Sequence, residues 1–200
     1  MAAETIEKLY TPAEYIAMEE AAVTKSEYIN GRIYAMSGAS YPHIIITGNT
    51  FREIGNQLGE SECEVFNSDM RIKISTSESY VYPDITVACG EKSFDSTLSA
   101  TLRNPKVVIE VLSPSTEAYD RGDKFAHYQL LPSLQEYVLI SQNKVRIERY
   151  TRDGDEWKYI ILDHLDATMH LASLNCHIPL RIIYRKVEFP ALPELAPPAE

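Results

Sequence analysis

A chain of 200 residues with 44% hydrophobic residues has the size and composition of one globular domain that buries a sizeable core. It has no run of eighteen or more apolar residues, and no charged segment followed by an apolar one at its N-terminus. We therefore expect neither a membrane span nor a signal peptide, and a cytoplasmic location. The net charge of −10 argues against a protein that holds nucleic acid by charge neutralisation alone, but it is compatible with a carboxylate site that recruits divalent cations.

The first part of the chain predicts two helices separated by a hairpin. Thr11-Pro12-Ala13-Glu14 is a capping box that begins a helix over 11–21. Asn30-Gly31 separates two alternating segments within 27–34, which predicts a tight hairpin. Apolar residues recur at helical spacing over 43–58 and predict the second helix.

The middle of the chain predicts most of a central sheet. Segments 63–74, 80–89 and 106–112 are rich in branched and aromatic residues and are predicted strands. A helix follows over 115–130, and 135–141 is another strand. The order of helix, three strands, helix and strand indicates a mixed α/β fold rather than a regularly alternating, doubly wound sheet.

The last part predicts a second hairpin and a tail. Asp153-Gly154 lies between the alternating segments 145–151 and 157–162, which predicts the hairpin. Four prolines follow within 188–200, which is typical of a proline-rich tail. We therefore expect a single domain over 1–187.

The three cysteines, Cys63, Cys89 and Cys176, are an odd number at wide spacings. This pattern favours reduced thiols that pack as small hydrophobic residues over a disulfide framework or a zinc site.

Two acidic residues stand out in the predicted strands. Period-two alternation puts Asp84 on the more polar face of its strand. Glu110 interrupts the near-continuous apolar run 107–112, which is typical of a strand covered on both faces. A buried charge there needs a partner, because an unpaired one is costly. That partner is either a metal ion or an arginine such as Arg103 or Arg121.

Two carboxylates on neighbouring strands suit Mg²⁺ or Mn²⁺, with positions left for water and phosphate oxygens. Such an ion polarises a phosphate and lowers the pKa of an attacking water, while a nearby lysine orients the water or offsets developing charge. Lys124 is the candidate lysine, since on the predicted helix it shares a stripe with Asp120, Tyr128 and Leu131. The alternative for Lys124 is a solvent-exposed helix pair with Asp120.

These motifs carry a family resemblance. The resemblance rests on Pro83-Asp84, the spaced Glu110, Ser113-Pro114-Ser115-Thr116 and the segment Tyr119-Asp120-Arg121-Gly122-Asp123-Lys124-Phe125. Together they resemble the Uma-type family of restriction-endonuclease-like proteins, from the first hairpin to Ile183-Tyr184. That family is similar in fold to the PD-(D/E)XK nuclease superfamily. The resemblance implies a mixed central sheet flanked by helices, with an αβββαβ core and added β-hairpins.

The resemblance also implies roles for individual residues. Asp84 corresponds to the first aspartate of the motif and Glu110 to the second acid, while the lysine expected two residues later is replaced by Leu112. In the family this lysine has moved to the following helix, which again indicates Lys124.

Three further polar residues are weaker candidates. The resemblance places Glu27 where it would complete a metal shell, and His43 where it would contact phosphate or water. Their alternatives are an exposed charge on a hairpin for Glu27 and a capping or core histidine for His43. Asp69 is a candidate third carboxylate.

Two functional hypotheses follow. The first is a Mg²⁺-dependent (or Mn²⁺-dependent) endonuclease that hydrolyses DNA by metal-activated water, acting as a homodimer by analogy with enzymes that cut both strands of a duplex. The second is a catalytically inactive nuclease-fold module that binds or interacts without cleavage, and it is favoured by Leu112 and by the acidic net charge.

Overall fold

The computed structural model describes residues 8–189. Helix α1 (Pro12–Ala21) begins as predicted, because Thr11 Oγ1 accepts the Glu14 amide at 3.2 Å while the Glu14 carboxylate accepts the Thr11 amide at 2.7 Å. The predicted hairpin is also confirmed, as strands β1 (Ser26–Ile29) and β2 (Arg32–Ala35).

The central sheet has six strands in the order β11-β10-β9-β8-β6-β3. Strands β8 and β9 are parallel, and every other neighbouring pair in this sheet is antiparallel. The strands are β3 (Cys63–Asn67), β6 (Ile85–Cys89), β8 (Val107–Leu112), β9 (Glu136–Ser141), β10 (Ile147–Asp153) and β11 (Glu156–Leu162).

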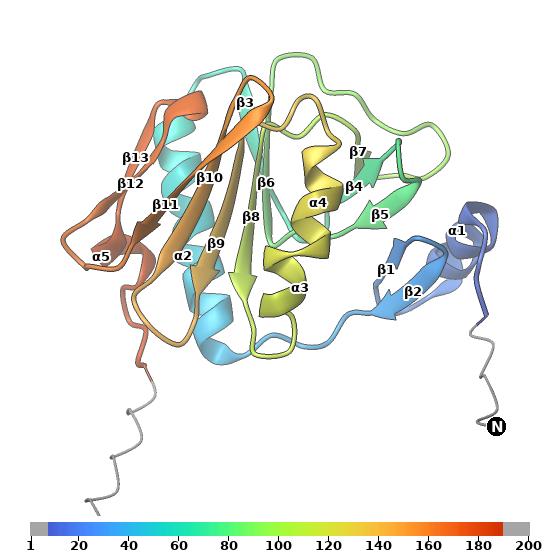
Figure 1. The fold of residues 1–200 in the computed structure, drawn as a ribbon, viewed down its shortest axis with the longest axis horizontal. Coiled ribbons are helices and arrows are strands. Elements are labelled where there is room, and N and C mark those ends of the chain that lie inside the picture. Colours follow the sequence, from blue (N-terminus) through green and yellow to red (C-terminus); the bar gives the residue numbers. More distant parts are fainter. Residues whose placement is uncertain (1–7, 190–200) are drawn as a thin grey trace, which may run out of the picture.

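Helices cover both faces of this sheet (Figure 1). Helix α2 (Tyr41–Leu58) packs on one face, where its Ile46 and Ile54 join Val107, Ile109 and Val111 in the larger core cluster. On the other face lie the short helices α3 (Glu117–Arg121) and α4 (Asp123–Gln129). Their core cluster includes Phe125 and Tyr128 from α4 with Val108, Leu112 and Tyr137 from the sheet.

The chain order α2, β3, β6, β8, α3–α4, β9 is the predicted αβββαβ core, and this prediction is confirmed. The connection from β8 through α3 and α4 to β9 explains the parallel pair of this sheet, since parallel strands need a crossover.

Two smaller sheets flank the core. The first has the order β2-β1-β5-β4-β7 and includes β4 (Arg71–Ile74), β5 (Ser79–Val81) and β7 (Thr101–Leu102). The second pairs β12 (Thr168–Leu171) with β13 (Cys176–Pro179), with a 3₁₀ turn (Ala172–Leu174) between them and α5 (Leu180–Ile183) after them. The sequence did not predict β7, β12, β13 or α5.

Two predicted strands were wrong in their extent. Segment 63–74 forms β3 and β4, and segment 80–89 forms β5 and β6, so each crosses from one sheet to another. The second break falls at Tyr82-Pro83-Asp84, where proline has no amide to donate to a ladder. Asp84 therefore lies just before β6 rather than within a strand.

The helix predicted over 115–130 is also broken. It divides at Gly122, whose φ of −106° and ψ of −100° are not helical. Thr116 occupies the N-cap position of α3 but makes no capping hydrogen bond.

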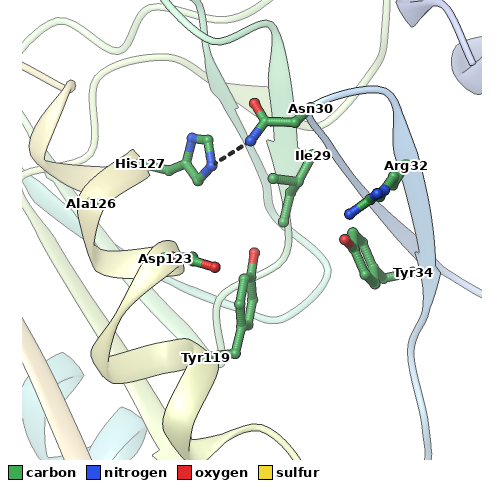
Figure 2. A pocket seen from close by; sticks show the side chains of 8 residues that line it. All are labelled: Ile29, Asn30, Arg32, Tyr34, Tyr119, Asp123, Ala126 and His127. Atoms are coloured by element: carbon green, nitrogen blue, oxygen red, sulfur yellow. Dashed lines mark hydrogen bonds between the residues drawn. The ribbon is translucent and has the colours of Figure 1, made fainter. Parts of the chain in front are cut away.

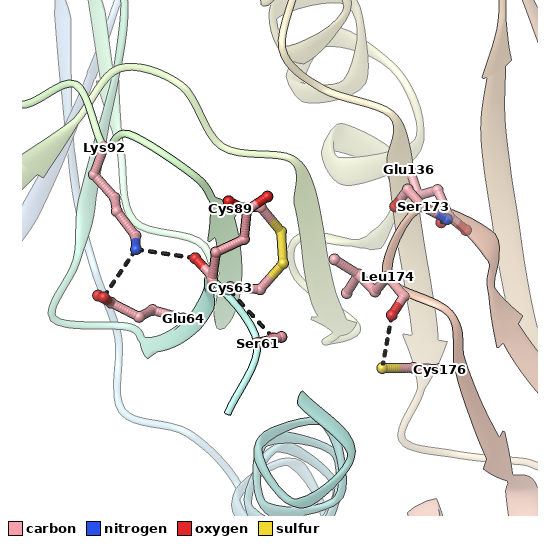
Figure 3. The surroundings of a disulfide bond; sticks show 10 residues. Ser61, Cys63, Glu64, Cys89, Lys92, Glu136, Ser173, Leu174 and Cys176 are labelled. Carbon is pink, nitrogen blue, oxygen red and sulfur yellow. Dashed lines mark hydrogen bonds and ion pairs between the residues drawn. A yellow bond between two sulfur atoms is a disulfide. The ribbon is translucent and has the colours of Figure 1, made fainter. Parts of the chain in front are cut away.

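The prediction of reduced cysteines was wrong for two of the three. Cys63 and Cys89 form a disulfide and lie directly opposite each other on β3 and β6 (Figure 3). Their separation of 26 residues hid this contact, because strand pairing and not sequence spacing brings them together. Cys176 is free and buried, as predicted.

The predicted tail is described only in part. Glu188 and Phe189 belong to no helix or strand, and the Phe189 ring lies 5.5 Å from that of Tyr184. Residues 190–200 lie outside the described residues. Within 8–189, no helix is long and apolar enough to cross a membrane.

Candidate functional site

Asp84 and Glu110 meet at one end of β6 and β8. The antiparallel register pairs Ile85 with Ile109, so Asp84 comes opposite Glu110. The Asp84 amide lies 3.4 Å from Glu110 Oε2, and the Val111 amide donates to Asp84 Oδ2 at 2.7 Å. The two predicted acids therefore occupy one neighbourhood at the sheet end.

The Glu110 side chain faces α4. Its neighbours Ile109 and Val111 pack towards α2, so strand alternation turns Glu110 to the other face. Only 4% of Glu110 is exposed, and Oε1 accepts the Tyr128 hydroxyl at 3.0 Å. Its charged partner is Lys124, whose Nζ lies 3.0 Å from Oε1.

Lys124 is the centre of a buried acidic cluster. Besides Glu110, its ammonium contacts Glu27 Oε1 at 3.0 Å and Asp120 Oδ1 at 3.7 Å. The Lys124 side chain is 7% exposed, so the alternative of a solvent-exposed helix pair was wrong. The helix stripe that predicted an inward lysine is confirmed.

The alternative arginine partners for Glu110 were also wrong. Arg121 pairs with Glu117 and Glu148, and Arg103 donates to the Ser75 hydroxyl.

The electrostatics of the cluster follow from three carboxylates, Glu27, Glu110 and Asp120, gathered around the Lys124 ammonium. Asp84 lies close to Glu110. Burial raises the pKa of Glu110 well above its usual range, although Lys124 opposes the shift. Burial likewise raises the pKa of Asp120, again against Lys124. Burial alone would lower the pKa of Lys124, but attraction to Glu110 and Glu27 outweighs it and raises that pKa. Lys124 is thus charged, and its single positive charge cannot neutralise all of the acid groups around it.

Glu27 and His43 both reach this cluster. Glu27, on β1, is 8% exposed and accepts the Tyr82 amide at 3.0 Å, so it is not an exposed hairpin charge. His43, in the first turn of α2, places Nε2 2.9 Å from Asp84 Oδ1. Its amide donates to the Ser40 N-cap hydroxyl at 3.3 Å, so the backbone of His43 takes part in capping while its ring contacts the site.

Asp69 does not belong to the site. It lies in the turn between β3 and β4, its side chain is 72% exposed, and it pairs with Lys25. The hydrogen bond from Lys25 lowers the pKa of Asp69.

The sequence assigned no site role to Asp120 or Tyr128. Both lie on the helix stripe of Lys124, four residues to either side, and that spacing was the available signal. Asp120 is 3% exposed and Tyr128 is fully buried.

Asp84, Glu110 and Glu27 offer the hard oxygen ligands that Mg²⁺ and Mn²⁺ prefer. Within residues 8–189, no three histidine, cysteine, aspartate or glutamate side chains are grouped closely enough to hold a metal ion by themselves. A cation here would have one or two protein carboxylates and complete its shell with water or phosphate oxygens, which is the usual arrangement for Mg²⁺.

Comparisons with known proteins agree with this architecture. A model of the Uma2 family, described as "Putative restriction endonuclease", matches residues 12–180. The uncharacterized protein slr1290 of Synechocystis sp. is 39% identical over 180 residues, which are 90% of this chain and 93% of that protein. The uncharacterized protein sll1609 of the same organism is 42% identical over 151 residues, which are 75% and 85% of the two chains.

A solved structure shares the fold. It is the crystal structure from Anabaena variabilis described as a putative nuclease belonging to DUF820. It matches with a TM-score of 0.73 and 19% identity over 87% of this chain and 97% of that one. Because the family model covers most of the chain and both curated relatives align over most of their length, the chain belongs to the Uma2 family.

Proposed function

We propose that this protein is a Mg²⁺- or Mn²⁺-dependent endonuclease that hydrolyses phosphodiester bonds of DNA. The observation that carries the proposal is the convergence of Asp84 and Glu110 at one sheet end, with the Lys124 ammonium 3.0 Å from Glu110. The description of the Uma2 family and the nuclease-like fold support the same reaction class.

The cluster fits a divalent cation. Glu27, Glu110 and Asp120 place three carboxylates around one ammonium in a mostly buried space, and burial raises the pKa of Glu110. Added positive charge would lower that pKa and favour the ionised ligand. Asp84 and Glu110 would hold the cation, and Glu27 would complete its shell through water. When bound, the ion polarises the phosphate and lowers the pKa of its bound water.

The remaining groups have roles of their own. Lys124 is held by Glu27 and Glu110, and in this proposal its ammonium would orient water or offset charge at phosphorus. We assign to the His43 ring a contact with a phosphate oxygen or the acceptance of a proton from water. Because Nε2 donates to Asp84 Oδ1 at 2.9 Å, the ring would accept that proton at Nδ1. Tyr128 donates to Glu110 and fixes the direction of that carboxylate.

Plasmid nicking tests the proposal. Wild type should convert supercoiled DNA to open-circular and linear forms with Mg²⁺ or Mn²⁺ and not with EDTA. Asp84→Asn should reduce the rate by about 100-fold or more, on the scale of losing one preorganised electrostatic group. Asp69→Asn is the matched control, because it removes an exposed carboxylate outside the site. Equal cleavage by wild type and Asp84→Asn would rule out the assigned site.

One observation favours a second candidate, a nuclease-fold binding module without catalysis. Lys124 already pairs with Glu110 and Glu27, and Leu112 stands where the superfamily lysine is expected. Calorimetric titration of wild type and Glu110→Gln with Mn²⁺ separates the two candidates. If the protein is a nuclease, wild type should bind Mn²⁺ and Glu110→Gln should lose that binding. If it is a binding module, Glu110→Gln should abolish no Mn²⁺ affinity.

Homodimerisation remains part of the proposal. Strand β11 forms one edge of the central sheet and exposes Ile160 and Ile161 by 38% and 41%. Light scattering during size-exclusion chromatography should give twice the 22.6 kDa chain mass, and a monomer at micromolar concentration would count against a dimer.

A further inference from the structure

A cavity of about 270 Å³ lies between the β1–β2 hairpin and helices α3–α4 (Figure 2). We name it the hairpin pocket. Figure 2 shows Tyr34 from β2 and Tyr119 from α3 on its two sides, with Asn30 and His127 joined by a hydrogen bond across it. It is a separate space beside the carboxylate cluster.

The hairpin pocket adjoins the candidate site on both of its walls. On the hairpin, Tyr34 is the cross-strand partner of Glu27. On the helices, the pocket residues Tyr119, Asp123 and His127 recur every four residues. The site residues Asp120, Lys124 and Tyr128 have the same spacing, and each directly follows one of these pocket residues in the sequence. The charges of Glu27, Lys124 and Glu110 also act on the Tyr119 hydroxyl, so a ligand group in the pocket would lie near whatever occupies the site.

Two buried polar atoms of the pocket residues lack partners in the described part of the chain. They are the Tyr119 hydroxyl and His127 Nδ1. Because the Asn30 amide nitrogen can only donate, His127 Nε2 accepts and the ring proton is on Nδ1. Burial raises the pKa of Tyr119, so its hydroxyl stays protonated. Both groups are buried donors without an acceptor, whereas most buried polar groups in proteins have a hydrogen-bond partner.

The other pocket residues match a nucleotide. Tyr34 is 47% exposed, and its ring lies 6.4 Å from that of Tyr119 at an interplanar angle of 27°, so this aromatic pair offers a surface for base stacking. The Arg32 guanidinium suits a phosphate, and the Asn30 amide suits the edge of a base.

We propose that the hairpin pocket binds a nucleotide of the DNA strand next to the phosphate at the site, with its base against Tyr34 and its phosphate near Arg32. This inference rests on the proposed nuclease function and adds a subsite for an unpaired nucleotide. A base can enter the pocket only from single-stranded or locally opened DNA.

Fluorescence anisotropy with a labelled single-stranded 12-mer deoxyoligonucleotide in Ca²⁺ tests the subsite. Tyr34→Ala should weaken binding about 5- to 50-fold, the scale of one lost base stack, and Tyr34→Phe should restore it to within about twofold. Tyr159→Ala is the matched control, since Tyr159 on β11 is 45% exposed and is not among the residues that line the pocket. Thermal unfolding of each variant confirms that it is folded.

A salt series tests the phosphate contact independently. Arg32→Gln should reduce the slope of log Kd against log salt by about 1, while Lys158→Gln, at an exposed lysine on β11, should leave it unchanged. The same slope for Arg32→Gln and Lys158→Gln, or the same affinity for Tyr34→Ala and Tyr159→Ala, would overturn the subsite.

Cleavage assays of these proteins keep the two proposals separate. If Mn²⁺-dependent cleavage occurs but Tyr34→Ala behaves as Tyr159→Ala in binding, the subsite fails and the nuclease proposal stands. If binding depends on Tyr34 and no metal supports cleavage, the subsite stands and the nuclease proposal fails. A wild type that binds no single-stranded DNA overturns the subsite outright.

Discussion

Replacing Lys124 by methionine removes the ammonium at the centre of a buried group of acids. Methionine keeps much of the side-chain volume, so the main change is electrostatic. Glu27 and Glu110 each lose a partner at 3.0 Å, and Asp120 loses one at 3.7 Å. Removing one partner of a buried ion pair destabilises a protein by about 3–5 kcal/mol. For a domain of this size, such a loss lowers the Tm by about 6–20 °C.

The assay is urea unfolding of wild type and Lys124→Met, with Lys144→Met at an exposed lysine as the control. As the pH falls, Glu110 and Asp120 take up protons at a higher pH in the folded protein than in the unfolded chain, because folding raises both pKa values. The deficit of Lys124→Met should therefore be largest near about pH 8 and shrink towards about pH 5. A deficit below about 1 kcal/mol, or one equal to that of Lys144→Met, would refute the buried cluster.

Three further predictions concern the scaffold. Burial alone would raise the pKa of Glu148, but hydrogen bonds from Arg121 and other partners outweigh burial and lower that pKa. The Glu148 carboxylate therefore stabilises the fold at a pH above its unfolded pKa, and this contribution is lost as the pH falls. Urea unfolding of Glu148→Gln should show a deficit at pH 7 that shrinks below about pH 4, and a pH-independent deficit would contradict the ion pair. Gly31 has φ of +83°, and a Cβ added to it would lie 3.4 Å from Leu9 Cβ. Gly31→Ala should therefore lower the free energy of unfolding by about 1 kcal/mol or more in chemical unfolding, and an unchanged free energy would argue against this turn. The Cys63–Cys89 disulfide closes a loop of 26 residues, and replacing both cysteines by alanine should lower the free energy of unfolding by about 3 kcal/mol in the chain-entropy model. If neither the substitution nor a reductant changes the stability, the bond does not form.

Local patterns predicted which of these side chains come together, because each pattern lies within one strand or helix. Glu110 was recognised as the single charge in an apolar strand, and Lys124 from its helix stripe. The structure brings the two side chains to 3.0 Å from each other. Asp84 was recognised from its motif, although it precedes β6 instead of lying within a strand.

Features that depend on how separate segments pair were missed. The division of 63–74 and 80–89 between two sheets is set by tertiary pairing, since the residues themselves favour strand throughout. Cys63 and Cys89 meet only because β3 pairs with β6. Asp120 had an ordinary surface explanation until the fold buried it to 3% exposure.

Soaking a crystal with Mn²⁺ and recording anomalous diffraction most directly tests the proposal that Asp84 and Glu110 share a metal ion. We expect a peak in contact with both carboxylates, and its loss in Glu110→Gln. A crystal that takes up Mn²⁺ elsewhere, or nowhere, while this pair stays free of anomalous density would contradict the metal-dependent nuclease.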